Sequence, residues 1–225
     1  IAIIPARGGS KRIPRKNIKL FYGKEIISYS VETALKSNLF EEVMVSTDDA
    51  EIAEIAVKYG ASVPFLRTPS NSNDVAGISE VIIEVLEKYK SQHINFDNVC
   101  CILATAPFLN DQDLKHSYQK LTSSYYDSVF PVVKYSFPIQ RAMQFSGNKI
   151  QMIWPENKTK RSQDLIPSFH DAGLFYWIKS DIIQKEKTLW TNNASAIEIS
   201  EQIAQDIDTP EDWEMAELKY KLLHG

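Results

Sequence analysis

Cysteine is nearly absent from this sequence, which limits the ways in which the fold can be stabilised. The 225 residues contain only Cys100 and Cys101, and these two are neighbours in an apolar run. Adjacent residues of a strand point to opposite faces of a sheet, so a disulfide between them is not expected. This excludes a small disulfide-stabilised secreted domain and predicts two reduced core thiols, as in the cytosol.

Long apolar runs are absent as well. No stretch of the sequence is long and apolar enough to span a membrane, and no basic-then-apolar signal segment opens it. We therefore expect a cytoplasmic protein with no membrane partner. Because the first residue, Ile1, already belongs to a strand-like run and is not Met, we also expect that a few residues precede it.

An excess of positive charge is missing from the chain as a whole. The formal net charge is -4, whereas a general nucleic-acid binder usually carries an excess of Lys and Arg, so no nucleic-acid partner is expected. Between residues 7 and 24, however, the sequence has seven basic residues and no acidic one. A basic cluster in an acidic protein predicts a site for a small polyanion.

The chain does contain a regular alternation of strand-like and helix-like segments. Strands are predicted at residues 1–5, 42–46, 62–66 and 99–105, and helices at residues 26–35, 50–59, 78–89 and 111–121. This order predicts an α/β fold with right-handed βαβ units and a mostly parallel sheet. One ligand cleft is then expected at the carboxyl ends of the strands, faced by the loops after Pro5, Ser46, Leu66 and Thr105.

The pattern changes after residue 133. A β-type insert is predicted at about residues 135–170, strands return at 172–178 and 196–199, and a last helix begins at Pro210. With no repeat and no linker, we expect one domain, residues 1–225, that carries this insert. The insert has too many apolar residues for a monomer, so we expect it to form the interface of a homodimer. These residues are Met143, Phe145, Met152, Ile153 and Trp154.

The candidate chemistry begins with a Gly- and base-rich loop after the first predicted strand. Gly8 and Gly9 let the backbone approach a ligand and direct N–H groups toward it. The Arg and Lys residues around them can neutralise phosphate charge, as a nucleoside triphosphate requires. The loop has neither the third Gly of a dinucleotide fingerprint nor the Ser or Thr of a Walker loop. The alternative is a solvated basic loop.

A pair of carboxylates near the end of the chain completes this site. Asp206 and Asp208 are two residues apart on extended backbone, so they can project to the same side. Mg²⁺ binds few protein carboxylates together with phosphate oxygens, and this pair could supply the protein share. The alternative is that Asp208 or Thr209 caps the last helix, although capping does not account for Asp206.

The run Arg-Gly-Gly-Ser-Lys-x-Ile-Pro-x-Lys-Asn at residues 7–17 resembles the CMP-sialic acid synthetase family. That family is a branch of the nucleotidyltransferases with a Rossmann-like three-layer sheet, and the resemblance covers essentially the whole chain. It implies a Mg²⁺-dependent enzyme that joins CTP and a nonulosonic acid, giving a CMP-sugar and pyrophosphate. Its implied metal ligands are Asp206 and Asp208.

The same resemblance implies a set of nucleotide-binding residues. Arg7, Ser10, Lys11 and Lys16 would hold the phosphates and Asn17 would touch the nucleoside. Arg67 would read the cytosine edge, although by itself it could equally be an exposed loop arginine. The full set is Arg7, Gly8, Gly9, Ser10, Lys11, Asn17, Arg67, Asp74 and Thr105. The turn at 104–108 departs from the Gln-Pro-Thr-Ser-Pro-like turn of the family, because Ala104 has no polar side chain.

For the acceptor, the resemblance implies that Arg161 grips the acid group of the sugar. The residues at 137–141 and 170–173 depart from the usual sialate enzymes, and together with those at 161–165 they look like the pseudaminic acid cytidylyltransferase branch. We therefore expect pseudaminate rather than N-acetylneuraminate as the acceptor. The implied acceptor residues are Gln140, Arg141, Arg161, Gln163, His170 and Asp171. By itself, His170 would be a loop residue with a local hydrogen bond.

The reaction implied by the resemblance is attack of the anomeric hydroxyl on the α-phosphorus of CTP. Such a step needs positioning and charge neutralisation, which we assign to Arg7, Lys16 and the metal-bound Asp208. His170 and Asp171 are the candidates for a general base. Three alternatives are another acceptor such as N-acetylneuraminate or legionaminate, a UDP-sugar-dependent glycosyltransferase, and a non-catalytic nucleotide-binding module.

Overall fold

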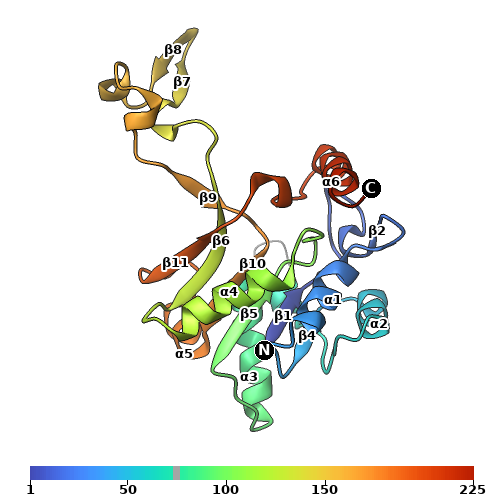
Figure 1. Ribbon diagram of the computed structural model, residues 1–225. Helices are drawn as coiled ribbons and strands as arrows, with labels where there is room; N and C mark the ends of the chain where they lie inside the picture. Colours follow the sequence, from blue (N-terminus) through green and yellow to red (C-terminus); the bar gives the residue numbers. More distant parts are fainter. Residues whose placement is uncertain (73–76) are drawn as a thin grey trace.

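The computed structural model describes residues 1–72 and 77–225 and is built around one large, mostly parallel sheet (Figure 1). The strands lie in the order β11-β6-β10-β5-β1-β4, with β9 also paired to β6. Among the strands of this sheet in the described residues, only β9 and β10 run antiparallel to their neighbours. Their bounds are β1 Ala2–Pro5, β4 Val43–Ser46, β5 Asn98–Ile102, β6 Ser128–Lys134, β9 Phe169–Asp171, β10 Phe175–Lys179 and β11 Ala194–Glu198.

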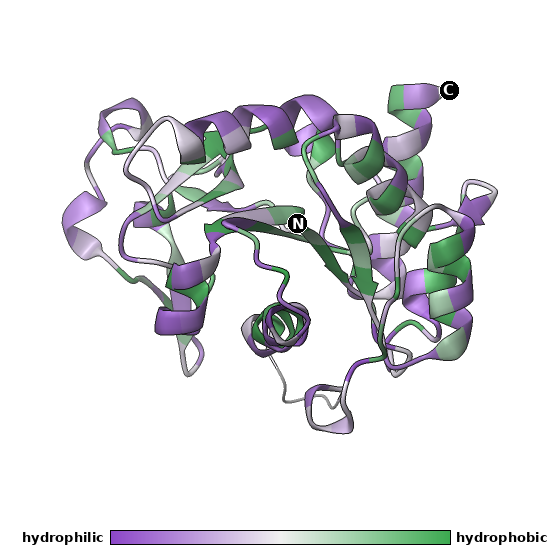
Figure 2. Ribbon diagram, turned by 90° about the horizontal axis from the view of Figure 1, so that it is seen from below, coloured by the Kyte–Doolittle hydropathy of each residue, from purple (hydrophilic) through white to green (hydrophobic). Residues whose placement is uncertain are grey.

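Helices cover both faces of this sheet, so the molecule has the three layers that the family resemblance implies (Figure 2). One face packs against α1 (Ile27–Ser37), α2 (Ala50–Lys58) and α4 (Asp111–Thr122). The other packs against α3 (Ile78–Ser91) and α5 (Ser180–Glu186). A third apolar cluster lies under α6 (Pro210–His224) and contains Phe21, Ile207 and Trp213.

The two cysteines lie back to back in the middle of the sheet. Cys100 packs in the cluster under α1 and α4, and Cys101 packs in the cluster under α3. Both thiols are free and fully buried, which confirms that they form no disulfide. Burial raises the pKa of both thiols, that of Cys101 to about 12, so neither is a reactive thiolate.

Local capping signals explain where three helices begin. Asp49 accepts a hydrogen bond from the backbone N–H of Ile52 at 3.1 Å and starts α2. Asn110 caps α4 in the same way, by accepting from the N–H of Asp113 at 2.9 Å. Thr209 forms a reciprocal capping box with Asp212 at the start of α6.

Two parts of the predicted layout are wrong. The strand predicted at 62–66 is only a single bridge between Ser62 and Met44. Pro64 has no N–H to donate, so the ladder does not continue there. The helix α5 and a small hairpin, β2 (Leu20–Phe21) with β3 (Lys24–Glu25), were not predicted; each is too short for a clear periodic pattern.

An arm projects from one end of the sheet (Figure 1). Its stem is the outer part of β6 paired with β9, and its tip is a hairpin of β7 (Met143–Ser146) and β8 (Lys149–Met152). The arm contains the segment predicted as a β-type insert. Its exposed large apolar residues are Tyr135, Phe137, Met143, Phe145, Ile150, Ile153, Trp154, Ile166 and Phe169.

Single-turn 3₁₀ helices punctuate the loops. They are η1 Lys16–Ile18, η2 Pro69–Asn71, η3 Ile139–Arg141, η4 Pro155–Asn157, η5 Ser162–Asp164 and η6 Glu201–Ile203.

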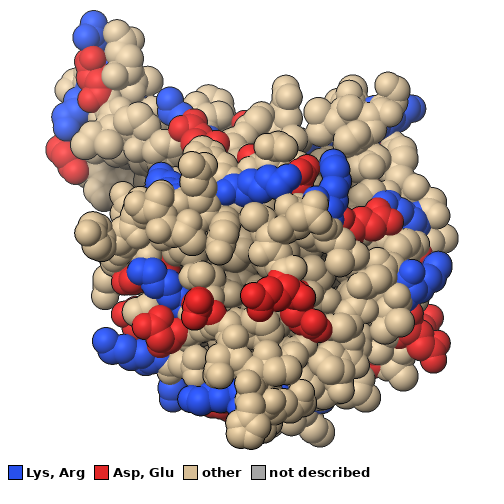
Figure 3. All heavy atoms as spheres, turned by 60° about the horizontal axis from the view of Figure 1, so that its bottom comes forward, with Lys and Arg blue, Asp and Glu red and all other residues tan. Residues whose placement is uncertain are grey.

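Within residues 1–72 and 77–225, no helix has both the length and the apolar character needed to cross a bilayer. On the face seen in Figure 3, basic and acidic side chains are interspersed and do not form a basic stripe.

Candidate active site

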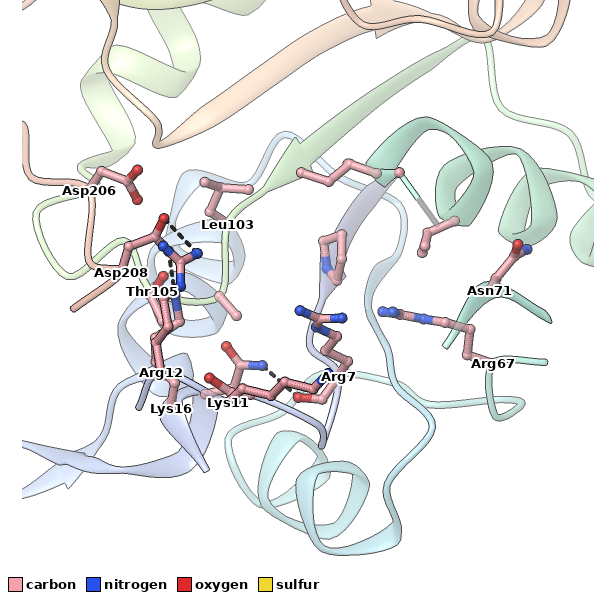
Figure 4. A pocket seen from close by; sticks show the side chains of 17 residues that line it. Arg7, Lys11, Arg12, Lys16, Arg67, Asn71, Leu103, Thr105, Asp206 and Asp208 are labelled. Carbon is pink, nitrogen blue, oxygen red and sulfur yellow. Dashed lines mark hydrogen bonds and ion pairs between the residues drawn. The ribbon is translucent and has the colours of Figure 1, made fainter. Parts of the chain in front are cut away.

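A cavity of about 530 Å³ opens at the carboxyl ends of β1 and β5 (Figure 4). Three of the four loops predicted to face one cleft contribute to its lining, namely those after Pro5, after Leu66 and around Thr105. The loop after Ser46 does not line the cavity and lies behind it. The lining residues are Pro5, Arg7, Ser10, Lys11, Arg12, Lys16, Asn17, Arg67, Asn71, Gly77, Ile78, Val81, Leu103, Ala104, Thr105, Asp206 and Asp208.

The basic loop is held closed from inside by Asn17. This buried side chain donates through Nδ2 to the carbonyl of Arg7 at 2.9 Å, so the two ends of the loop lie together. Gly8 and Gly9 are not part of the cavity wall, contrary to the expectation that both N–H groups face a ligand. Instead, the Gly8 N–H donates to Oδ1 of Asp48 at 3.0 Å. A Cβ at Gly8 would lie 2.5 Å from Oδ2 of Asp49, so a side chain there would displace that carboxylate.

Two arginines extend into the cavity from different walls (Figure 4). Arg7 comes from the basic loop, and the buried Arg67 comes from the segment that follows the Ser62 bridge. The Arg67 guanidinium donates to the carbonyl of Ser46 and, through Nε, to its Oγ at 3.2 Å. Burial lowers the pKa of Arg67, and the nearby charge of Arg7 adds to that effect while Asp48 opposes it. Two cations held close together suit a polyanionic ligand.

The acid pair lies on the wall opposite Arg67 (Figure 4). Ile207, between the two carboxylates, is fully buried in the cluster under α6, so Asp206 and Asp208 both face the cavity. Lys16 Nζ lies 3.1 Å from Oδ1 of Asp208 and also donates to the carbonyl of Ile207. Arg12 completes the contact, with its guanidinium 2.9 Å from Oδ2 of Asp208.

Asp206 and Asp208 are the residues of this wall that could hold a divalent cation. Reduced solvation among the surrounding protein atoms raises the pKa of Asp206, and the neighbouring charge of Asp208 raises it further. A divalent cation would relieve that repulsion, and two carboxylates leave coordination sites for phosphate oxygens. Among the residues that the structure describes, no group of three or more His, Cys, Asp or Glu could hold a metal ion. The pair would therefore need phosphate oxygens to complete the coordination of a cation.

Most of the predicted nucleotide residues therefore meet in one cavity. The structure brings together Arg7, Ser10, Lys11, Lys16, Asn17, Arg67, Thr105, Asp206 and Asp208. Asp74 lies outside the described residues. Arg12 and Asn71 line the cavity but were not assigned a role from the sequence. The signal for Arg12 was present, because it belongs to the same basic run.

The six predicted acceptor residues do not line this cavity. Arg161 is exposed on the arm and forms a two-point ion pair with Asp164, at 2.8 and 3.0 Å. Gln140 donates to the carbonyl of Ile166 at 2.8 Å, and Arg141 donates to the carbonyl of Lys160. Gln163 lines a separate cavity of about 300 Å³ within the arm, beside the outer end of the stem.

The remaining two acceptor candidates lie on β9. His170 is exposed and makes a local contact, with Nδ1 2.9 Å from the carbonyl of Asp171 and its ring beside Tyr135. The Asp171 carboxylate accepts from the N–H of Gly173 at 3.1 Å and from the hydroxyl of Tyr176. Burial raises the pKa of Tyr176 and the bond to Asp171 raises it further, so the hydroxyl remains a donor.

Known proteins resemble this chain over its whole length. A Pseudaminic acid cytidylyltransferase of Campylobacter jejuni is 43% identical over 225 residues, covering 100% of this chain and 97% of the relative. A CMP-N,N'-diacetyllegionaminic acid synthase of Legionella pneumophila is 34% identical, covering 96% of this chain and 94% of the relative.

Solved structures share the fold. A CMP:2-keto-3-deoxy-manno-octonic acid synthetase complexed with CTP superposes with a TM-score of 0.74 at 18% identity, covering 99% of this chain and 98% of the other. The family model described as Cytidylyltransferase matches residues 1–220. With this match added to the full-length relatives and the cavity at the strand ends, the chain belongs to the cytidylyltransferase family.

Proposed function

We propose that this enzyme transfers the cytidylyl group of CTP to a nonulosonic acid, with pseudaminic acid as the preferred acceptor. The main observation behind this proposal is that the basic side chains of the loop and the carboxylates of Asp206 and Asp208 line the same cavity (Figure 4). The choice of acceptor is supported by the 43% identity to the Campylobacter jejuni pseudaminic acid enzyme over the full chain.

CTP would lie with its triphosphate against the basic loop and its base toward Arg67. Arg7, Lys11 and Lys16 line the loop side of the cavity and supply positive charge for the phosphates. Arg67 is fixed by its bonds to Ser46, so its remaining guanidinium N–H groups can donate to the acceptor atoms of cytosine. This orientation places the α-phosphate between the loop and the acid pair.

Mg²⁺ would be held by Asp206 and Asp208 together with phosphate oxygens. When bound, it would neutralise phosphate charge and polarise the transferring group. The chain prepares this site by burying Ile207, which turns both carboxylates inward. Lys16 belongs to the basic loop and lies 3.1 Å from Asp208, so it connects the loop that would hold the phosphates to the carboxylates that would hold the metal.

In the transfer itself, the anomeric hydroxyl oxygen of the acceptor forms a bond to the α-phosphorus, and the bond to the β-phosphate oxygen breaks. Pyrophosphate leaves with the electron pair, and the hydroxyl proton passes to solvent or to a base. Arg7 and Lys16 stabilise the charge that develops on the phosphates. Asp171 is poorly suited to be that base, because Gly173 and Tyr176 already donate to its two oxygens.

We propose that the acceptor role of Arg161 is fulfilled in a homodimer. Arg161 and Gln163 lie on the arm and do not line the nucleotide cavity of their own chain. The exposed apolar tip, with Phe145 79% exposed and Ile150 59% exposed, suits burial against another subunit. A homodimer would therefore cover the arm and bring these side chains to a cavity.

The test is release of pyrophosphate from CTP and Mg²⁺ with pseudaminate, N-acetylneuraminate and legionaminate in parallel. We expect release with pseudaminate, much slower release in Asp208→Asn, and little change in Glu211→Gln on the exposed first turn of α6. Release only with another acceptor would overturn the acceptor assignment. CTP binding without release on any acceptor would favour a non-catalytic nucleotide-binding module. We also propose a cytoplasmic location, which the two free thiols support.

A further inference from the structure

Arg15 is the one arginine of residues 7–17 whose side chain leaves the cavity. It has a left-handed backbone conformation, with φ 55° and ψ 30°, at the start of η1. Its guanidinium turns toward the N-terminal end of α2 and donates to both carboxylate oxygens of Asp49, at 2.9 Å for the longer bond, and to Glu51. A bidentate pair of this kind fixes direction as well as distance.

Asp49 is itself held in place by two other contacts. Its Oδ1 caps α2 at the N–H of Ile52, and its own N–H donates to Oγ1 of Thr47 at 3.1 Å. Hydrogen bonding from Arg15 is the largest cause that lowers the pKa of Asp49, so the carboxylate stays charged. The anchor for Arg15 is therefore a fixed point at a helix terminus.

The segment 47–49 also contacts other parts of the nucleotide cavity from behind. Asp48 accepts from the N–H of Gly8 at 3.0 Å, and the carbonyl of Thr47 accepts from the N–H of Arg67 at 2.7 Å. None of residues 47–49 lines the cavity. The segment thus supports the start of the basic loop, its end at Arg15, and the arginine on the base side.

We propose that Arg15 is a positioning residue for CTP, acting through Asp49 to hold the basic loop in its binding geometry. The residue after it, Lys16, turns inward to reach Asp208 at 3.1 Å and the carbonyl of Ile207. Because Arg15 is bound to Asp49 outside the cavity, the next two residues, Lys16 and Asn17, are held with their side chains toward the cavity. The loop then binds the triphosphate without first having to be ordered. This inference rests on the proposed use of CTP.

The decisive variant is Arg15→Asn. Asn tolerates the left-handed conformation, so the backbone keeps its shape while the guanidinium is lost. We expect the Kd for CTP, measured by titration calorimetry without acceptor, to rise about tenfold, equivalent to about 1.4 kcal/mol. The KM for CTP rises by the same factor while kcat stays within about twofold, because the reacting groups are intact.

Three companion variants separate positioning from general stability. Asp49→Asn keeps the helix cap through its side-chain oxygen but weakens the pair, so it should raise the Kd as Arg15→Asn does. Arg15→Lys should recover part of the affinity. Glu51→Gln, which leaves the pair with Asp49 intact, should bind CTP as the wild type does.

The outcomes distinguish this inference from the proposed function. Wild-type affinity for CTP in Arg15→Asn, or an equal loss in Glu51→Gln, overturns the role of Arg15. A wild type that binds CTP but releases no pyrophosphate overturns the proposed transfer and leaves the Kd comparison to decide the inference. A wild type that does not bind CTP overturns both.

Discussion

Protonation of Glu84 is expected to cost the fold a measurable part of its stability at low pH. Glu84 lies on α3 with its side chain 11% exposed. It accepts from the N–H and the hydroxyl of Thr68, each at 2.9 Å, and from the amide of Asn71, and it pairs with Lys88 at 2.7 Å. The residue therefore ties the segment that follows Arg67 to α3.

These contacts set the size and the sign of the effect. Burial alone would raise the pKa of Glu84, but bonds from Lys88, Thr68 and Asn71 outweigh it and lower the pKa from 4.5 to about 2. A difference of about 2.5 units corresponds to about 3 kcal/mol of unfolding free energy. Because the folded pKa is depressed, this contribution is complete above pH 4.5 and is lost as the pH falls toward 2, with about 2 kcal/mol lost by pH 3.

The assay is urea unfolding of the wild type and of Glu84→Gln at pH 6 and pH 3. Other carboxylates titrate in both proteins, so the difference between their two pH dependences isolates Glu84. We expect the wild type to lose about 2 kcal/mol more than the variant. Glu87→Gln, at an exposed position on the same helix, should follow the wild type. Parallel pH dependences for the wild type and Glu84→Gln would refute the reasoning.

Three further predictions concern the metal wall and the arm. Asp208→Asn should lower kcat/KM in pyrophosphate release by on the order of 10²-fold, because it removes charge beside the phosphates; a loss below tenfold would contradict this. Ile207→Ala should lower the free energy of unfolding in urea by about 2–5 kcal/mol, because the side chain is fully buried. A loss under about 1 kcal/mol would contradict the close packing of Ile207 under α6. Phe145→Asp should convert a dimer to a monomer in light scattering, whereas Leu222→Asp, on the exposed end of α6, should not; a monomeric wild type would remove the basis for the arm interface.

Local signals account for what the sequence predicts well. Asp49 and Asn110 are side-chain caps that act within three residues, and the helices they start lie where the pattern placed them. The opposite orientation of Cys100 and Cys101 follows from strand geometry alone. The cavity was predictable because parallel strands present their carboxyl ends at one edge.

Features that depend on distant partners were not predictable. The antiparallel direction of β10 is decided by its pairing with β5 and β6, which no local pattern records. The Arg12 contact to Asp208 joins residues at opposite ends of the chain. The acceptor residues were assigned by motif, and a motif carries no information on whether a side chain faces its own cavity or projects on an arm.

The way the arm is attached has a mechanical consequence. Strand β6 is paired with β11 and β10 in the sheet and then with β9 in the stem, so one ladder runs from the core into the arm. Seven extended residues span about 20 Å, and a paired ladder over that length bends little. The direction in which the stem leaves the core is therefore set by the pairing of β6 inside the sheet, for example by Val129 opposite Trp177.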